Sequence, residues 1–158
     1  MENDLLVLAD QLGQYLKARN QTIATAESCT GGWIAECITS VAGSSTWFDR
    51  GFVTYSNNAK QQMLGVRAET LEKFGAVSQE TASEMVAGAL AHSEADCALA
   101  VTGIAGPDGG SSDKPVGTVY IAWQTRNQPI TAIRSQYSGN RQQIRKQTVI
   151  TAIEGVIR

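Results

Sequence analysis

The sequence lacks the features that mark several specialised classes of protein. Its 13 lysines and arginines are scattered rather than gathered in a block, and the net charge is −2 at pH 7. Because general nucleic-acid binders present a basic face to the phosphate backbone, we expect no nucleic acid as a partner. No apolar run reaches about 18 residues, the length of a membrane-spanning helix, so we expect no membrane partner either.

Cysteine is scarce as well. The three cysteines, Cys29, Cys37 and Cys97, cannot all pair, and their spacing matches no zinc-binding pattern. Reduced thiols in a cytoplasmic protein are the simplest interpretation. The acidic residues Glu2 and Asp4 stand where a signal peptide would be basic. We therefore expect a cytoplasmic location, no metal and no cofactor.

The composition that is present suits one globular domain. The chain has 158 residues, of which 42% are hydrophobic and 18% are charged. These fractions are ordinary for a soluble globular protein, if light in charge. Because the chain is too short for two domains of typical size, we expect a single domain over residues 1–158.

Helical and strand-like patterns alternate along most of the chain. Apolar spacing predicts helices over residues 4–19, from Gly31 to about Ser40, over 59–64, over 68–74, from a cap at Ser78 to His92, and from a cap at Asn140 to the end. Strands are predicted over 22–27, 50–55, 96–102, 116–124 and 130–137, with the last two forming a hairpin. This order predicts a three-layer α/β/α sandwich on a mixed, mostly parallel sheet of about five or six strands.

Three polar or glycine-rich segments follow predicted strands at their carboxyl ends. They cover residues 27–32, 55–60 and 102–114. Ligands of such sheets bind outside the carboxyl ends of the parallel strands. If these strands are parallel, the three segments meet at one edge, and we expect the functional site there.

The first of these segments, Glu27 to Gly32, joins a predicted strand to a predicted helix. This junction places Ser28 at a helix N-terminus, where free N–H groups can bind an anion or stabilise an oxyanion. Gly31 and Gly32 allow the backbone to approach a ligand closely. Ser28 or Thr30 can also be a plain N-cap, which is the commoner role. Cys29 is a rival nucleophile, because a helix N-terminus activates a thiolate.

The second segment carries Tyr55 at a strand end and Lys60 near the start of a helix. A positive charge near a helix N-terminus is disfavoured, so this lysine would lose its proton more readily and could act as a base. A Ser-Lys pair is a known variant of the serine nucleophile. A solvated surface lysine is the alternative. The only histidine, His92, is interpreted as a surface residue at a helix end, which disfavours a Ser-His hydrolase.

The third segment contains the densest run of glycine in the chain, over residues 103–110. Its spacing, G-x-x-G-x-x-G-G, lacks the lysine of a phosphate-binding P-loop and is not the dinucleotide fingerprint. Consecutive N–H groups in such a loop can form an anion nest. A flexible connection fits the same pattern, and the sequence leaves both interpretations open.

Five motifs then occur in one order along the chain. They read AESCTGG at 26–32, GFVTYSN at 51–57, GAVS at 75–78, TGIAGPDGG at 102–110 and KPVGTV at 114–119. Together they resemble the CinA C-terminal domain family from about residue 5 to 157. The stand-alone members of this family are nicotinamide-nucleotide amidohydrolases. The resemblance implies an α/β/α sandwich that usually dimerises, and hydrolysis of nicotinamide mononucleotide to nicotinate mononucleotide and ammonia in pyridine-nucleotide salvage.

The resemblance also implies roles for individual residues. The family's nucleophilic serine corresponds to Ser28, and its tyrosine and lysine partners correspond to Tyr55 and Lys60. Lys60, directly or through Tyr55, is expected to take the serine proton. N–H groups around Thr30 and Gly31 are expected to stabilise the oxyanion.

The expected substrate contacts are Thr30, Gly31, Gly32, Asn57, Thr102, Gly103, Ile104, Ala105, Gly106, Arg141 and Arg145. Arg134 is a further candidate for the substrate phosphate. A catalytically silent pyridine-nucleotide-binding module is the alternative function. It would keep the glycine loop without a working Ser28–Lys60 pair, and an ammonia-release assay separates the two.

Overall fold

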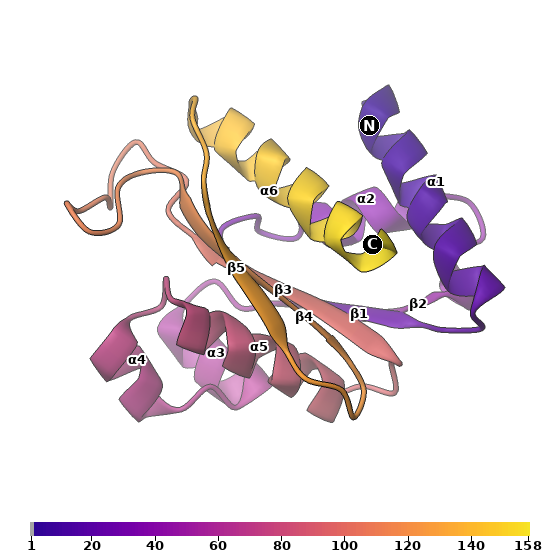
Figure 1. Cartoon of the computed structure of the whole chain (residues 1–158), viewed down its shortest axis with the longest axis horizontal. Helices are drawn as coiled ribbons and strands as arrows, with labels where there is room; N and C mark the ends of the chain where they lie inside the picture. The colour runs from indigo at the N-terminus through magenta and orange to yellow at the C-terminus, as the bar shows by residue number, and fades with distance from the viewer. Residues whose placement is uncertain (1) are drawn as a thin grey trace.

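A mixed β-sheet organises the chain in the computed structural model, which describes residues 2–158 (Figure 1). Within that range the sheet has five strands in the order β2-β1-β3-β4-β5. The strands are β1 Ile23–Glu27, β2 Phe48–Val53, β3 Cys97–Gly103, β4 Thr118–Thr125 and β5 Thr131–Gln136. β1 is parallel to β2 and β3, whereas β4 is antiparallel to both β3 and β5. Only β4 runs against the others, which confirms the predicted mixed, mostly parallel sheet.

Helices cover both faces of the sheet and complete the predicted three layers (Figure 1). One face carries α1 Asn3–Ala18, α2 Trp33–Thr39 and α6 Arg141–Ile157. The other face carries α3 Asn57–Leu64, α4 Ala68–Phe74 and α5 Gln79–Ala91. A 3₁₀ turn, Ser44–Thr46, links α2 to β2. No helix within residues 2–158 combines the length and apolar character needed to cross a membrane.

Each face of the sheet has its own hydrophobic core. Leu12, Ile34 and Val149 are buried in the core beneath α1, α2 and α6. Met85 and Ala100 are buried in the core beneath α5. The central strands β1 and β3 are buried on both sides, which explains the nearly continuous apolar sequence of β3 and the small number of polar residues in β1.

Two elements, β2 and α3, have boundaries that differ from the prediction. β2 starts at Phe48 rather than at 50 and ends at Val53 rather than at 55. Its pairing with β1 starts early because the Ile23 N–H donates to the carbonyl of Trp47, at 2.9 Å. α3 begins at Asn57 rather than at 59, because Ser56 caps it by accepting from the Ala59 N–H. The predicted capping box of Asn140 and Gln143 at the start of α6 is confirmed.

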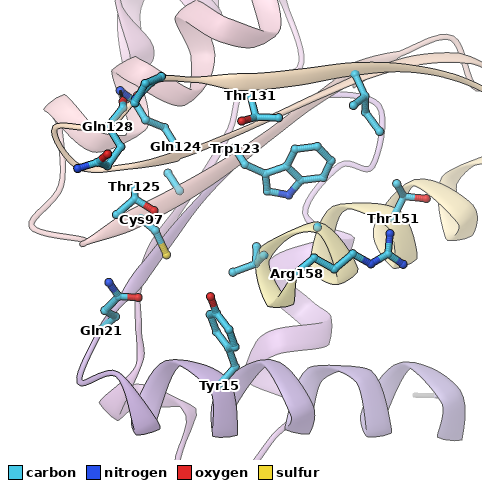
Figure 2. Close-up of a pocket in the computed structure, with 15 residues that line it drawn as sticks. Tyr15, Gln21, Cys97, Trp123, Gln124, Thr125, Gln128, Thr131, Thr151 and Arg158 are labelled. Atoms are coloured by element: carbon cyan, nitrogen blue, oxygen red, sulfur yellow. Dashed lines mark hydrogen bonds between the residues drawn. The ribbon is translucent and has the colours of Figure 1, made fainter.

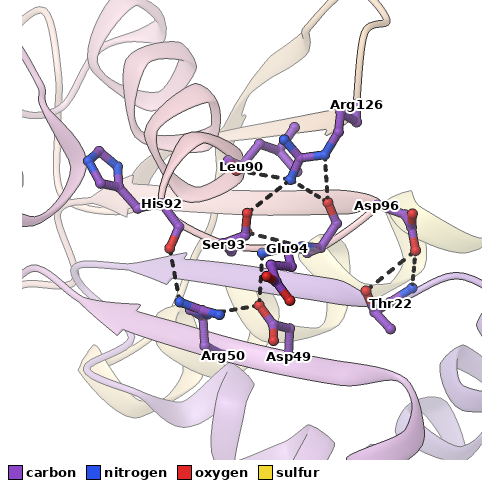
Figure 3. Close-up of polar contacts among 10 residues, drawn as sticks. Thr22, Asp49, Arg50, Leu90, His92, Ser93, Glu94, Asp96 and Arg126 are labelled. Atoms are coloured by element: carbon purple, nitrogen blue, oxygen red, sulfur yellow. Dashed lines mark hydrogen bonds and ion pairs between the residues drawn. The ribbon is translucent and has the colours of Figure 1, made fainter.

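A polar cluster ties the elements together at the amino ends of the parallel strands (Figure 3). The Arg126 guanidinium donates to the carbonyls of Leu90, Ser93 and Ala95, just after α5. The Asp96 carboxylate accepts from the backbone of Thr22. These contacts stabilise the turns at this edge, which lies opposite the carboxyl ends of β1 and β3.

His92 belongs to the same amino-end edge of the sheet. It is exposed at the end of α5, and its Nδ1 lies 2.9 Å from the carbonyl oxygen of Gly88 (Figure 3). This placement confirms the interpretation of His92 as a surface residue. It also separates the histidine from Ser28, which follows the carboxyl end of β1.

Candidate active site

The three predicted segments meet at the carboxyl ends of β1, β2 and β3. They enclose a cavity of about 270 Å³. Among the predicted site residues, those that line it are Ser28, Tyr55, Asn57, Lys60, Thr102, Gly103, Ile104, Ala105, Gly106 and Arg141. Cys29, Ala76, Val77, Asp108 and Gly109 also line it. The last four were not expected, although they lie within or beside the GAVS and glycine-loop motifs.

A direct hydrogen bond joins Ser28 and Lys60 at the base of this cavity. Lys60 Nζ lies 2.9 Å from Ser28 Oγ. The same nitrogen lies 2.9 Å from the carbonyl oxygen of Thr54 and 3.3 Å from that of Tyr55. Lys60 is only 1% exposed. Within residues 2–158 it forms no salt bridge, so no carboxylate here compensates a charge on the buried amine.

Burial lowers the pKa of Lys60 below its ordinary value, because a buried ammonium loses its hydration. The sequence argument ascribed this effect to the helix N-terminus, whereas desolvation is the larger cause. A neutral Lys60 can donate its two N–H groups to the Thr54 and Tyr55 carbonyls. Its lone pair then faces Ser28 Oγ, which is the geometry of a base beside a nucleophile.

Tyr55 occupies a different place from the one expected of a proton relay. Its side chain is 61% exposed, and its hydroxyl accepts a hydrogen bond from Arg141 Nη2 at 3.0 Å. Lys60 contacts only the backbone carbonyl of Tyr55. Ser28 and Lys60 are therefore joined by a direct hydrogen bond without Tyr55 between them, and the Tyr55 phenol lines the cavity with Arg141.

Cys29 is poorly suited to be the nucleophile. Burial, assisted by the nearby Glu27 carboxylate, raises the pKa of its thiol to about 12. The thiol therefore stays protonated near neutral pH and is a weak nucleophile. The expected activation by a helix N-terminus is absent, because the first N–H groups of α2 bind Glu27 instead.

Glu27 is the residue that sequence reasoning missed. Its buried carboxylate accepts from Thr30 Oγ1 at 2.6 Å and from the N–H groups of Gly32, Ile34 and Ala35 at 2.9–3.2 Å. It thus occupies the N-terminus of α2, which is not free to bind an anion. The sequence feature that could have indicated this role is a single carboxylate at the end of a mostly apolar strand.

Thr30, Gly31 and Gly32 are not among the residues that line the cavity, and the N–H groups of the two glycines are already bonded, contrary to the prediction that these glycines contact substrate. The Thr30 hydroxyl and the Gly32 N–H donate to Glu27. The Gly31 N–H donates to the carbonyl oxygen of Ser28 at 2.9 Å, which closes a turn over residues 28–31. Because its N–H is occupied, Gly31 is not an oxyanion donor.

The three candidate arginines lie at different places relative to the cavity. Arg141 lines the cavity and donates to the carbonyl of Gly106 at 2.7 Å. Arg145 was predicted to contact substrate but does not line the cavity. It donates to the carbonyls of Cys29 and Thr30. Arg134 donates to the carbonyl of Asp113. Arg141 is therefore the arginine of the three at the cavity.

The glycine loop is held in place rather than freely mobile. Lys114 Nζ donates to the carbonyls of Phe74 and Val77, which ties the loop to the segment before α5. Within residues 2–158, the N–H groups of Ala105, Gly106, Asp108 and Gly109 donate to no protein acceptor. They are available to a ligand beside Arg141.

A larger cavity of about 490 Å³ lies at the opposite edge of the sheet (Figure 2). Figure 2 shows Tyr15 from α1 and Trp123 from β4 on either side of it. None of the predicted site residues lines this cavity. Among residues 2–158 there is also no group of three or more His, Cys, Asp or Glu side chains that could hold a metal ion.

Comparisons with known proteins identify the family to which this chain belongs. Residues 6–158 match the model of the CinA C-terminal domain. Nicotinamide-nucleotide amidohydrolase PncC of Escherichia coli strain K12 is 55% identical over 154 residues, which cover 97% of this chain and 93% of that protein. The protein of the same name from Pseudomonas putida is 51% identical over 97% of this chain and 95% of its own length. A crystal structure of competence/damage inducible protein CihA from Agrobacterium tumefaciens superposes with a TM-score of 0.96, at 49% identity over 99% of this chain and 96% of that one.

Proposed function

This chain belongs to the CinA C-terminal domain family, and we propose that it hydrolyses the carboxamide of nicotinamide mononucleotide with Ser28 as nucleophile and Lys60 as base. The products are nicotinate mononucleotide and ammonia, a reaction of pyridine-nucleotide salvage. One observation supports the residue roles most strongly. The buried Lys60 amine lies 2.9 Å from Ser28 Oγ inside the cavity.

The first half of the reaction forms an acyl-enzyme. Ser28 Oγ attacks the carboxamide carbon while its proton moves to the neutral amine of Lys60. The carboxamide oxygen becomes an oxyanion, which requires N–H donors beside the nucleophile. Within residues 2–158, the N–H groups of Cys29 and Thr30 donate to no protein acceptor, which supports them as these donors.

The second half of the reaction releases the product. The Lys60 ammonium gives its proton to the departing nitrogen, so that ammonia leaves and the nicotinoyl group remains as an ester on Ser28. A water molecule then attacks the ester carbon, and Lys60 takes its proton. The ester bond breaks, Ser28 Oγ recovers the proton, and the carboxylate product leaves.

The substrate phosphate binds at the mouth of the cavity in this proposal. Arg141 supplies a guanidinium there, and the glycine loop supplies N–H groups without protein acceptors. The start of α6 carries no acidic residue in its first turn, so its dipole also favours an anion. Asn57 and Tyr55 lie at the same cavity.

A homodimer and a cytoplasmic location complete the proposal. The resemblance to the family supports the dimer, and cysteines that form no disulfide within residues 2–158 support the reducing compartment. Light scattering on the purified chain tests the dimer. A mass of one chain at micromolar concentration would reject it.

An ammonia-release assay with nicotinamide mononucleotide tests the activity and the nucleophile together. Ser28→Ala should lower turnover by roughly 10⁴-fold or more, because the acyl-enzyme cannot form. Ser40→Ala is the matched control, since the Ser40 hydroxyl contacts only the Glu36 carbonyl of its own helix.

Circular dichroism should show the same fold for wild type and both variants. Near-normal turnover by Ser28→Ala would reject Ser28 as nucleophile. Binding of the nucleotide by wild type without ammonia release would instead favour the catalytically silent module.

A further inference from the structure

The turn that follows Ser28 is held from two sides. On one side, Glu27 accepts from the Gly32, Ile34 and Ala35 N–H groups and thereby occupies the start of α2. On the other side, Arg145 Nε donates to the carbonyl of Cys29 at 3.1 Å, and its Nη2 donates to that of Thr30 at 3.0 Å. The turn is thus fixed by charged side chains that do not line the cavity.

Arg145 has the properties of a residue dedicated to this turn. It comes from α6, more than a hundred residues after Ser28, and is half-buried with its guanidinium 5.4 Å from the centre of the Trp33 ring. Within residues 2–158 it forms no salt bridge. The carbonyls of Cys29 and Thr30 are its hydrogen-bond acceptors in place of a carboxylate.

The contacts of Arg145 decide where the N–H groups of the turn point. In a trans peptide the C=O and N–H groups point in opposite directions. With the Cys29 carbonyl directed at Arg145, the Thr30 N–H of the same peptide points away from α6. With the Ser28 carbonyl bound to the Gly31 N–H, the Cys29 N–H also points out of the turn.

The contact with Arg145 also makes the Thr30 N–H a stronger hydrogen-bond donor. A carbonyl that accepts from a cation polarises its whole peptide unit, which makes the N–H of that unit a better donor. The Thr30 N–H belongs to the peptide whose carbonyl binds Arg145 Nε. The positive charge therefore acts on the oxyanion site without touching the substrate.

We propose that Arg145 is a positioning residue, which orients the peptides after Ser28 so that the Cys29 and Thr30 N–H groups bind the oxyanion. This inference rests on the proposed amidohydrolase reaction at Ser28. It assigns Arg145 to the transition state rather than to the substrate phosphate, for which Arg141 is the candidate.

Steady-state kinetics of Arg145→Ala with nicotinamide mononucleotide test the inference. An oxyanion donor is worth roughly 10²–10³ in kcat, so we expect kcat to fall by about that factor while KM changes by less than about threefold. The pH at which activity rises should stay the same as in wild type, because Lys60 and its contacts are unchanged. Added guanidinium ion at millimolar concentration should restore part of kcat by filling the vacated space.

Arg126→Ala is the matched control. Arg126 also donates to several backbone carbonyls, but at the opposite edge of the sheet (Figure 3). Its loss should lower the melting temperature and leave kcat and KM unchanged. Guanidinium ion should have no effect on its kcat.

Arg145→Lys keeps the test decisive if the alanine variant does not fold. Lysine retains the charge but lacks the planar fork that reaches two carbonyls, so kcat should fall at least about tenfold. A wild-type kcat in either folded variant would overturn the inference. So would a raised KM with unchanged kcat, which would make Arg145 a substrate-binding residue. Ser28→Ala assayed alongside shows whether the proposed function itself has failed.

Discussion

Lys60 is a buried amine without a carboxylate partner within residues 2–158, and its chemistry follows from that isolation. A salt bridge would keep the amine protonated, whereas the two backbone carbonyls can also accept hydrogen bonds from a neutral amine. The pKa of Lys60 is therefore lowered mainly by desolvation. This is the condition under which a lysine can act as a general base near neutral pH.

The pH profile of kcat/KM should report this lowered pKa. Only neutral Lys60 can take the Ser28 proton, so activity should rise with pH through an acid limb and then level off. The midpoint of the limb should lie below 10.5, the ordinary value for lysine. Initial rates of ammonia release at a series of pH values measure it.

Lys60→Arg is the control for this pH profile. A guanidinium stays protonated at every accessible pH, so the variant should be inactive throughout. An acid limb that persisted unchanged in an active Lys60→Arg variant would contradict Lys60 as the base.

The sequence predicted that Ser28 and Lys60 lie together, which the structure shows, but it did not predict which side chains hold the turn after Ser28. The family motifs and the strand-helix junctions marked the pair. Arg145 was expected at the phosphate, because nothing local indicates that a side chain of the last helix turns toward Cys29 and Thr30. Such contacts join parts of the chain that are adjacent only after folding.

At the level of elements, α2 depends on a carboxylate that lies outside the helix. Gly32 at its N-cap is in the left-handed region and has no side chain to cap the helix. Glu27, at the end of β1, accepts from the first N–H groups instead. One residue therefore joins the strand, the turn that carries Ser28, and the helix.

Glu27→Gln should destabilise the protein and test this role. Both Glu27 oxygens accept N–H groups, so the amide NH₂ would face a donor such as the Ala35 N–H. Leaving such a buried donor unpaired costs about 1–3 kcal/mol. For a chain of this size that lowers the melting temperature by roughly 2–12 °C.

Glu80→Gln is the matched control for Glu27→Gln. Glu80 is exposed in the first turn of α5, so its change should alter stability by about 0.5 kcal/mol or less. Thermal unfolding followed by circular dichroism compares the two variants. Equal melting temperatures for them would contradict the role of Glu27.

The elements themselves were largely predictable, and the reason is their periodicity. Buried strands such as β3 have continuous apolar sequence, and the caps at Ser78 and Asn140 mark helix starts. The edge strand β2 lies two residues earlier in the chain than predicted. Its burial pattern does not alternate, and its register is set by pairing with β1.

At the level of the whole molecule, the sheet separates two kinds of polar residue. The amino ends of the parallel strands carry a cluster whose hydrogen bonds close turns, with Arg126 and Asp96 at its centre (Figure 3). The carboxyl ends carry donors without protein acceptors, together with the buried pair of Ser28 and Lys60. The contacts that close turns and the proposed reactive pair thus lie at opposite edges, as expected where ligands bind at strand carboxyl ends.

The buried amine should also make the stability of the whole molecule depend on pH. Below its lowered pKa, Lys60 is protonated in both states, and burial of the ammonium disfavours the native state. As pH rises from that pKa toward 10.5, the native protein releases the proton while the unfolded chain retains it. The unfolded state then binds more protons, so the free energy of unfolding rises with pH across this window.

Lys60→Met removes this ionisation, and it also removes the nearby charge that lowers the pKa of Cys29. The three buried cysteines, whose thiol pKa values are raised to about 11 or 12, oppose the trend above pH 9 but are shared by both proteins. Urea unfolding from neutral pH to about pH 10 should therefore show wild type gaining stability relative to the variant. A constant difference across that range would mean that the native protein binds the Lys60 proton as tightly as the unfolded chain does, and Lys60 could not then be the base.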